Sequence, residues 1–193
     1  DIVQTQNGEW YLVHLCGRPI PSKGRCPMGR ETAIQKVVWT DDGWLRLEGG
    51  GNKPAVTVPA TALPEHSFEK EPSRDDFDSD KLSIHFQSLR VPLGEDSLSL
   101  KERPGFLRLK GRESFASRHF QSLIARRQQA FCYTAAACVE FEPESYKQMA
   151  GIVCILNNLN YFYLKISHDE EIGKCLGIIA CDNGAYNEPI GKG

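Results

Sequence analysis

Short apolar runs separated by turn residues recur along most of the chain, and this pattern predicts an all-β protein. Residues 9–15, 32–39 and 44–48 are predicted strands near the start. The turn at 40–44 contains Gly43, which is free to take a positive φ, and it joins the last two strands into a hairpin. The first part of the chain is therefore predicted to be a small antiparallel meander.

The composition changes between residues 49 and 80, where glycine, proline and charged residues predominate. A connector of this length is uncommon inside one compact domain, so the pattern favours two units. We predict a first unit over residues 1–62 that includes the start of the connector, a linker over 63–80 and a second unit over 81–193.

Strand patterns resume after Leu82 at intervals of about ten residues, which is typical of a β-sandwich or barrel. One segment, 142–150, could hold a helical turn. In the run 161–163, alternation places Tyr161 and Tyr163 on one face of the strand and Phe162 on the other. The predicted strands are 86–91, 105–111, 120–128, 131–141, 149–158, 161–167 and 173–182.

The overall charge argues against nucleic acid or an anionic membrane as a partner. The formal net charge is −2 and the pI is about 6.2. No run approaches the roughly 18 apolar residues that a membrane-spanning helix needs. The chain begins without Met and enters a strand-like pattern at once, so we expect it to be a piece of a longer protein, truncated at both ends.

The seven cysteines do not suggest a disulfide framework or a zinc site, because the number is odd and no C-x-x-C occurs. Most lie in apolar runs such as 135–141 and 151–156, where cysteine packs as a small hydrophobic residue. This usage favours a reducing cytoplasm. The five histidines are scattered, and no metal or cofactor is expected.

No catalytic motif is recognisable from the residues alone. G-x-S-x-G, the P-loop and G-x-G-x-x-G are all missing. The carboxylates of residues 168–171 could bind Ca²⁺, but a solvated hairpin turn is the preferred interpretation. Glu31 follows Arg30, which is expected to hold it ionised, so Glu31 is not a candidate acid. What remains is a polar cluster at a strand end, Cys26–Glu31.

Two blocks of sequence carry a specific resemblance. "NGEWYLVHLCGRPIP" followed by "GRCPMGRETAIQKVVWTDDGWLRLEGGGNKP" resembles the last propeller blade of the β-xylosidases of glycoside hydrolase family 43, with Met28 where leucine is usual. "LSLKERPGFLRLKGRES", "ARRQQAF" and "VEFEPESYKQMAGIVCILNNLNYFYLKISHDEE" resemble the β-sandwich appended to the same enzymes. The resemblance implies the last blade of a five-bladed β-propeller, followed by a concanavalin-like β-sandwich, with both domains incomplete.

The resemblance also implies an activity. Such enzymes release xylose from the non-reducing ends of β-1,4-xylooligosaccharides by inverting hydrolysis, and many relatives cleave arabinofuranosides. Their catalytic aspartate and glutamate lie in earlier blades, so no catalytic residue is expected in this chain and the piece alone should be inactive. An aromatic side chain that closes their pocket lies later in the sandwich and is also expected to be missing.

Three residues are candidates for the site. Arg30 matches the active-site arginine of the family, and a planar cation with five donors suits vicinal hydroxyls. Cys26 is placed at the pocket rim, with a packing thiol as the alternative. Glu31 is expected to orient Arg30 or the turn, with a surface Arg30–Glu31 ion pair as the alternative. Arg18 is expected to be structural, closing the blade.

Two further interpretations stay open. The sandwich could be a non-catalytic carbohydrate-binding or assembly module, or the chain could be a gene product without function. The partners implied by the resemblance are a xylooligosaccharide, the remainder of the same enzyme and, in a homo-oligomer, further copies of the chain.

Overall fold

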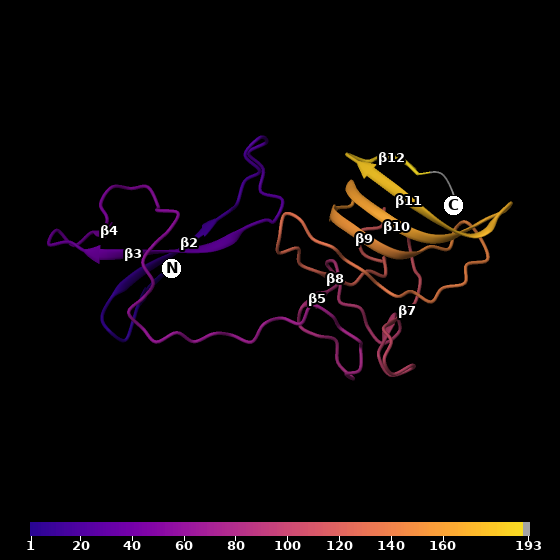
Figure 1. Ribbon diagram of the computed structural model, residues 1–193, viewed down its shortest axis with the longest axis horizontal. Helices are drawn as coiled ribbons and strands as arrows, with labels where there is room; N and C mark the ends of the chain where they lie inside the picture. Colours follow the sequence, from indigo (N-terminus) through magenta and orange to yellow (C-terminus); the bar gives the residue numbers. More distant parts are fainter. Residues whose placement is uncertain (191–193) are drawn as a thin grey trace. The chain divides into compact units, whose positions relative to one another are not determined.

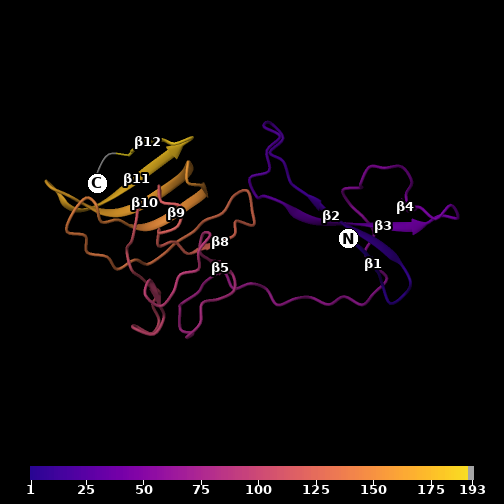
Figure 2. The same ribbon diagram turned by 180° about the vertical axis from the view of Figure 1, so that it is seen from behind.

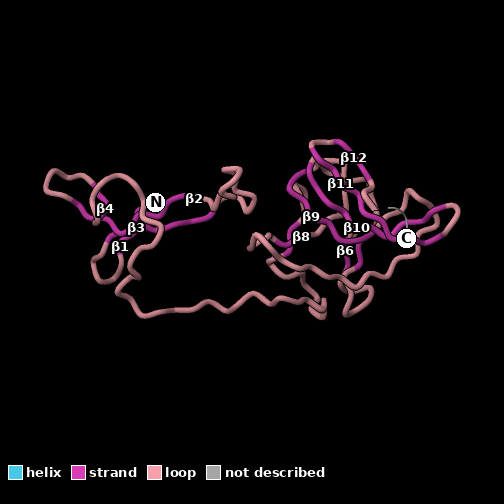
Figure 3. The backbone as a smooth tube through the Cα atoms, turned by 45° about the horizontal axis from the view of Figure 1, so that its top comes forward, coloured by secondary structure: helices cyan, strands magenta, loops and turns pink. Residues whose placement is uncertain are grey.

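A computed structural model describes residues 1–190, and it is all-β over this range. Figure 3 shows strands joined by long loops, without a helix in the described range. None of these residues therefore forms a helix able to cross a membrane. The chain divides into two compact units. The first is Asp1–Lys70 with Gln129–Phe131, and the second is Glu71–Gln128 with the chain from Cys132 onward.

The first unit is a four-stranded antiparallel sheet in the order β1-β2-β3-β4 (Figures 1 and 2). The three predicted strands are confirmed, and a fourth, β1, precedes them. At three residues, β1 is too short to show a period. The strands are β1 (Ile2–Gln4), β2 (Trp10–Cys16), β3 (Glu31–Trp39) and β4 (Leu45–Leu47).

Both faces of this sheet contain buried residues. Tyr11 of β2 is 1% exposed and Val37 of β3 is 3% exposed. The Nζ of Lys36 lies 3.0 Å from Glu9 Oε1 and 2.9 Å from Glu48 Oε1, so one cation ties the start of β2 to the end of β4. Each carboxylate in turn raises the pKa of Lys36, which keeps the cation charged.

The first part of the predicted connector folds back onto the first sheet. Nε2 of Gln35 donates to the carbonyl oxygen of Ala55 (2.9 Å), and the Ala55 N–H donates to Gln35 Oε1 (3.0 Å). Further along, the Ala62 N–H donates to Glu9 Oε2 (3.3 Å). Residues up to 62 thus belong with the first unit, although the boundaries 1–62, 63–80 and 81–193 stay predictions.

The second unit is built on a larger sheet with the order β12-β11-β10-β9, which curves strongly (Figure 1). Two short pairs, β5 with β8 and β6 with β7, accompany it. The strands are β5 (Phe86–Gln87), β6 (Leu98–Ser99), β7 (Arg108–Leu109), β8 (Ala125–Arg126), β9 (Ala150–Asn157), β10 (Asn160–Asp169), β11 (Gly173–Asp182) and β12 (Ala185–Asn187).

The last three predicted strands are confirmed as β9, β10 and β11, and the turn after His168 joins β10 to β11 as a hairpin. The Asp169 carboxylate accepts the N–H of Glu171 (3.0 Å) in that turn. The predicted strands 86–91, 105–111 and 120–128 are present only as two-residue strands, at 86–87, 108–109 and 125–126. The first of them ends near Arg90, which takes a left-handed φ of 63°.

The predicted strand 131–141 is wrong. Over 142–150 no helix forms, but a single hydrogen-bonded turn does, in which the Gln148 N–H donates to the carbonyl oxygen of Ser145 (3.0 Å). The run Ala135–Ala137 has a low preference for strands. A strand also needs a neighbour to complete its backbone hydrogen bonds, and within residues 1–190 none pairs with this segment. Side chains hold it instead, through the ion pairs Arg103–Glu140 and Lys174–Glu142.

An aromatic cluster forms the core of the second unit. Tyr161 and Tyr163 are 4% and 8% exposed, whereas Phe162 is 61% exposed, so the predicted alternation is confirmed. The Phe115 ring lies 5.2 Å from Tyr161 and 4.9 Å from Tyr163, measured between centroids. Asn158 Nδ2 donates to the carbonyl oxygen of Phe115 (2.8 Å), which fixes that ring over the sheet.

Tyr163 should make the second unit less stable in alkali. Burial raises the pKa of Tyr163 to about 12, against about 10 in an unfolded chain. Between these values the unfolded state binds fewer protons than the folded state, so the free energy of unfolding falls as pH rises. Below about pH 10 the contribution is fully present.

Between about pH 10 and pH 12, we expect the free energy of unfolding to fall by about 1–3 kcal/mol less in Tyr163→Phe than in the wild type. Chemical denaturation followed by far-UV circular dichroism would measure it. The matched control is Tyr146→Phe, because Tyr146 is 60% exposed. Equal pH dependence in wild type and Tyr163→Phe would contradict the prediction.

Candidate functional site

The candidate site is the loop of residues 17–30 that joins β2 to β3. Its tip is a narrow hairpin in which Ile20 pairs with Arg25. Gly24 closes the tip with a φ of 61°, and its N–H donates to the carbonyl oxygen of Ile20 (2.8 Å). A residue with a β-carbon is disfavoured in this left-handed conformation, which explains glycine at this position.

A second turn, Cys26–Gly29, brings the loop back to the sheet. The Gly29 N–H donates to the carbonyl oxygen of Cys26 (3.0 Å), and Gly29 has a φ of 79°. Met28 within this turn is only 6% exposed, so the turn contributes a buried apolar side chain.

Gly17 and Cys26 approach each other closely across the base of the loop. A β-carbon at Gly17 would lie 2.9 Å from Cys26 Sγ and 3.5 Å from the carbonyl oxygen of Gly29. Cys26 itself is exposed and free. The structure thus gives Cys26 a packing contact with Gly17 at an exposed position, and its predicted place at a pocket rim remains a prediction.

Glu31 is held by Arg18 and not by Arg30, so the alternative of a surface Arg30–Glu31 ion pair is wrong. Arg18 Nε donates to Glu31 Oε2 and Arg18 Nη2 donates to Glu31 Oε1, each at 2.8 Å. The Arg18 guanidinium holds the pKa of the Glu31 carboxyl below its ordinary value, against the opposing effect of burial. Glu31 is therefore ionised as expected, although a different arginine is the cause.

Arg30 is exposed at the residue before β3. Within residues 1–190 its guanidinium makes no hydrogen bond or ion pair. The backbone on both sides is fixed, by the Cys26–Gly29 turn before it and by Glu31 after it. Its five donors are thus available to a ligand.

A general acid needs a carboxyl group with a raised pKa, and the shifts found here go the other way. Ion pairs or hydrogen bonds lower the pKa of several carboxyl groups, which therefore remain ionised. Lys36 is the main cause for Glu9, Arg18 for Glu31, Thr40 for Asp42 and Arg103 for Glu140.

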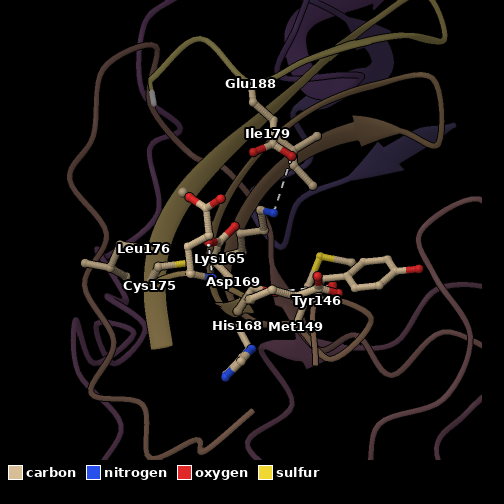
Figure 4. A pocket seen from close by; sticks show the side chains of 13 residues that line it. Tyr146, Met149, Lys165, His168, Asp169, Cys175, Leu176, Ile179 and Glu188 are labelled. Carbon is tan, nitrogen blue, oxygen red and sulfur yellow. Dashed lines mark hydrogen bonds and ion pairs between the residues drawn. The ribbon is translucent and has the colours of Figure 1, made fainter. Parts of the chain in front are cut away.

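Two hollows lie elsewhere in the structure. One of about 570 Å³ lies in the second unit, at the end of β10 and the start of β11 (Figure 4). Two of its polar side chains are paired: Lys165 Nζ lies 3.4 Å from Glu188 Oε1, and Ser167 Oγ donates to the carbonyl oxygen of Gln148 (3.0 Å). The His168 ring points away from the ion pair (Figure 4). Arg30, Cys26 and Glu31 are not among its lining residues.

A second hollow, of about 410 Å³, lies in the first unit and is lined by His14 and Gln35 among others. The His14 Nδ1 lies 3.0 Å from the carbonyl oxygen of Leu15, so this nitrogen carries the proton. The other ring nitrogen, Nε2, is buried and has no partner within the described residues.

Among residues 1–190, no cluster of three or more histidine, cysteine, aspartate or glutamate side chains could hold a metal ion. All seven cysteines are free. Cys181 is buried, as predicted for a core cysteine, but Cys138 and Cys154 are exposed, so that prediction is wrong for them. Cys138 lies in the segment that forms no strand, and Cys154 lies on the sheet face opposite Tyr161.

Comparison with known families matches both units in order. A model of glycosyl hydrolases family 43 matches residues 1–45, and a model of the beta xylosidase C-terminal concanavalin A-like domain matches residues 74–192. A blade-type sheet followed by a concanavalin-like unit defines the class of two-domain propeller glycosidases. The chain belongs to glycoside hydrolase family 43.

Individual relatives agree over nearly the whole chain. A beta-xylosidase of Bacillus subtilis (strain 168) is 42% identical over 198 residues, which is 98% of this chain and 37% of that protein. The crystal structure of xylan beta-1,4-xylosidase from Bacillus halodurans C-125 is 51% identical with a TM-score of 0.90, covering 99% of this chain and 37% of that one.

A relative named as an arabinofuranosidase also matches. This non-reducing end alpha-L-arabinofuranosidase of Bacteroides ovatus is 38% identical over 168 residues, covering 86% of this chain and 31% of that protein. The chain thus spans about a third of the length of the curated relatives that it matches.

Sequence reasoning missed the partnership of Arg18 with Glu31. The pairing of β2 with β3 could have indicated it. Cys16 is opposite Glu31 in the last pair between these strands, so Arg18 follows just beyond that pair. Sequence adjacency of Arg30 and Glu31 pointed to the wrong arginine, because neighbouring residues of an extended chain point to opposite sides.

The contact between Gly17 and Cys26 generates a prediction. Gly17→Ala should lower the free energy of unfolding of the first unit by about 1–3 kcal/mol, because the new methyl group meets Cys26 Sγ. Tryptophan emission during denaturation would report it, since Trp10, Trp39 and Trp44, the three tryptophans of the chain, all lie in this unit.

Cys26→Ala in the Gly17→Ala background should restore at least half of that loss, because it removes the sulfur. Cys26→Ala alone is the control. If the losses in the free energy of unfolding of the two single variants add in the double variant, there is no steric clash between the two side chains.

Proposed function

We propose that residues 1–193 belong to an exo-acting β-xylosidase that releases xylose from the non-reducing ends of β-1,4-xylooligosaccharides. The two family matches in the right order support this, as do relatives named beta-xylosidase and xylan beta-1,4-xylosidase. The arabinofuranosidase of Bacteroides ovatus supports α-L-arabinofuranosides as further substrates.

The observation that carries the proposal is the placement of Arg30. This arginine is exposed and, within residues 1–190, unpaired, at a backbone position fixed on both sides. We assign it to substrate binding, where its planar guanidinium donates hydrogen bonds to adjacent sugar hydroxyls. Its positive charge also favours the ionised form of a nearby carboxyl group. Cys26 and Glu31 belong to the rim around it.

The catalytic carboxylates are proposed to lie outside these 193 residues. A general acid protonates the leaving oxygen while a general base activates water on the opposite face of the ring, which inverts the anomeric centre. The lowered pKa of Glu9, Glu31, Asp42 and Glu140 makes these four unsuited to the acid role.

The alternative of a carbohydrate-binding sandwich has less support. Such a module would stack sugars on exposed aromatic rings, but of the three consecutive aromatic residues 161–163, Tyr161 and Tyr163 are buried and Phe162 alone is exposed. A reducing, cytoplasmic location is also proposed, supported by seven free cysteines. Assembly into a homo-oligomer is part of the same proposal.

The activity test uses the natural polypeptide that contains residues 1–193 together with whatever precedes and follows them. We expect turnover of p-nitrophenyl β-D-xylopyranoside and of xylobiose, with α-xylose as the first product seen by proton NMR, because an inverting enzyme converts a β-linkage to an α-anomer. A folded polypeptide that hydrolyses neither a β-xyloside nor an α-L-arabinofuranoside would contradict the proposal.

Arg30→Ala in the same polypeptide should lower kcat/KM for the xyloside about 10- to 100-fold, the effect of losing one or two charge-assisted hydrogen bonds. Arg25→Ala is the matched control, because Arg25 is exposed on the same loop and its side chain makes no bond within the described residues. Equal kcat/KM for Arg30→Ala and Arg25→Ala would rule out the assigned role.

A further inference from the structure

The ion pair between Arg18 and Glu31 is bidentate, and it fixes the orientation of both side chains. Its two parallel bonds, both 2.8 Å, hold the planar guanidinium and the carboxylate in one plane. The two side chains are 52% and 30% exposed. A bidentate arginine–carboxylate pair adds geometric specificity as well as energy, so this pair fixes the orientation of both groups.

That geometry acts on the residue next to the pair. Glu31 is the first residue of β3 and is opposite Cys16, the last residue of β2. Arg30 directly precedes Glu31, so holding the Glu31 side chain toward Arg18 restrains the backbone from which the Arg30 side chain extends. Without the pair, the strand end could fray and Arg30 would sample more directions.

A second contact restrains Arg18 itself. Its guanidinium carbon lies 5.6 Å from the centre of the Phe131 ring, within the range of a cation–π interaction. Phe131 belongs to Gln129–Phe131, the short segment that joins the first unit. Arg18 is thus held by a carboxylate and by an aromatic ring, which limits its own rotamers.

We propose that Arg18 is a positioning residue for Arg30: through Glu31 it sets the direction in which Arg30 meets the sugar. The inference rests on the proposed function. It differs from a blade-closing role for Arg18, because a residue that only closes the blade would affect stability whether or not Arg30 is present. A positioning residue affects catalysis through Arg30 alone.

The test is a double-mutant cycle in the natural polypeptide, with p-nitrophenyl β-D-xylopyranoside as substrate. We expect Arg18→Ala to lower kcat/KM about 5- to 20-fold in the wild-type background and less than about 2-fold in the Arg30→Ala background. Glu31→Gln, which keeps the size of the side chain and one acceptor, should give a smaller loss with the same dependence on Arg30. Tryptophan emission on denaturation checks that each variant is folded.

The possible results separate the two proposals. If Arg18→Ala or Glu31→Gln lowers kcat/KM by the same factor in both backgrounds, or leaves it unchanged in the wild type, the positioning role is overturned and the assigned function of Arg30 stands. If Arg30→Ala itself has no effect, both the assignment of Arg30 and the positioning role are overturned. Arg25→Ala is the control in each background.

Discussion

The antiparallel register of β2 and β3 is the constraint on which the candidate site depends. It places Cys16 opposite Glu31, and so brings Arg18 within reach of the Glu31 carboxylate. Since side chains alternate along a strand, a slip of one residue would turn Glu31 away and expose Val37 on the wrong face. Burial of Val37 on one face and Tyr11 on the other opposes such a slip. The apolar packing of the sheet thus determines where the polar loop ends.

The second unit depends on a different kind of constraint, in which polar groups place an apolar ring. Phe115 comes from a loop, and loops alone position side chains poorly. Asn158 binds the carbonyl oxygens of Phe115 and Ser117, and Arg90 in turn donates to Asn158 Oδ1 (3.1 Å). Arg90 adopts a left-handed φ of 63°, which is uncommon for a residue with a side chain. The hydrogen bonds that it makes offset this backbone strain.

Long strands with a clear period were predictable from the sequence, whereas most short strands were missed or predicted too long. β9, β10 and β11 each have eight or more residues, so alternation identified them and also separated Tyr161 and Tyr163 from Phe162. Strands of two or three residues, such as β6 and β12, carry no period. The apolar residues of segment 131–141 did not suffice for a strand, because a strand also depends on a neighbouring strand, which the tertiary structure supplies.

The position of the candidate residues was predictable from the sequence, and their contacts were not. Sequence placed Cys26, Arg30 and Glu31 beside the start of a strand, and β3 does begin at Glu31. Their assignment to a substrate site stays a prediction. It could not identify the partner of Glu31, because the hairpin loop brings Arg18 back from thirteen residues away.

The double contact between Gln35 and Ala55 has a chemical consequence. The side-chain amide offers one donor and one acceptor to a backbone, as a neighbouring strand would. Hydrolysis of that amide to a carboxylate would exchange the donor for a second acceptor facing the Ala55 carbonyl oxygen, and the two would repel. Gln35 is 5% exposed, so water reaches it poorly while the sheet is closed. The fold thus protects the Gln35 side-chain amide from hydrolysis. The same amide attaches residues 49–62 to the sheet through its two hydrogen bonds.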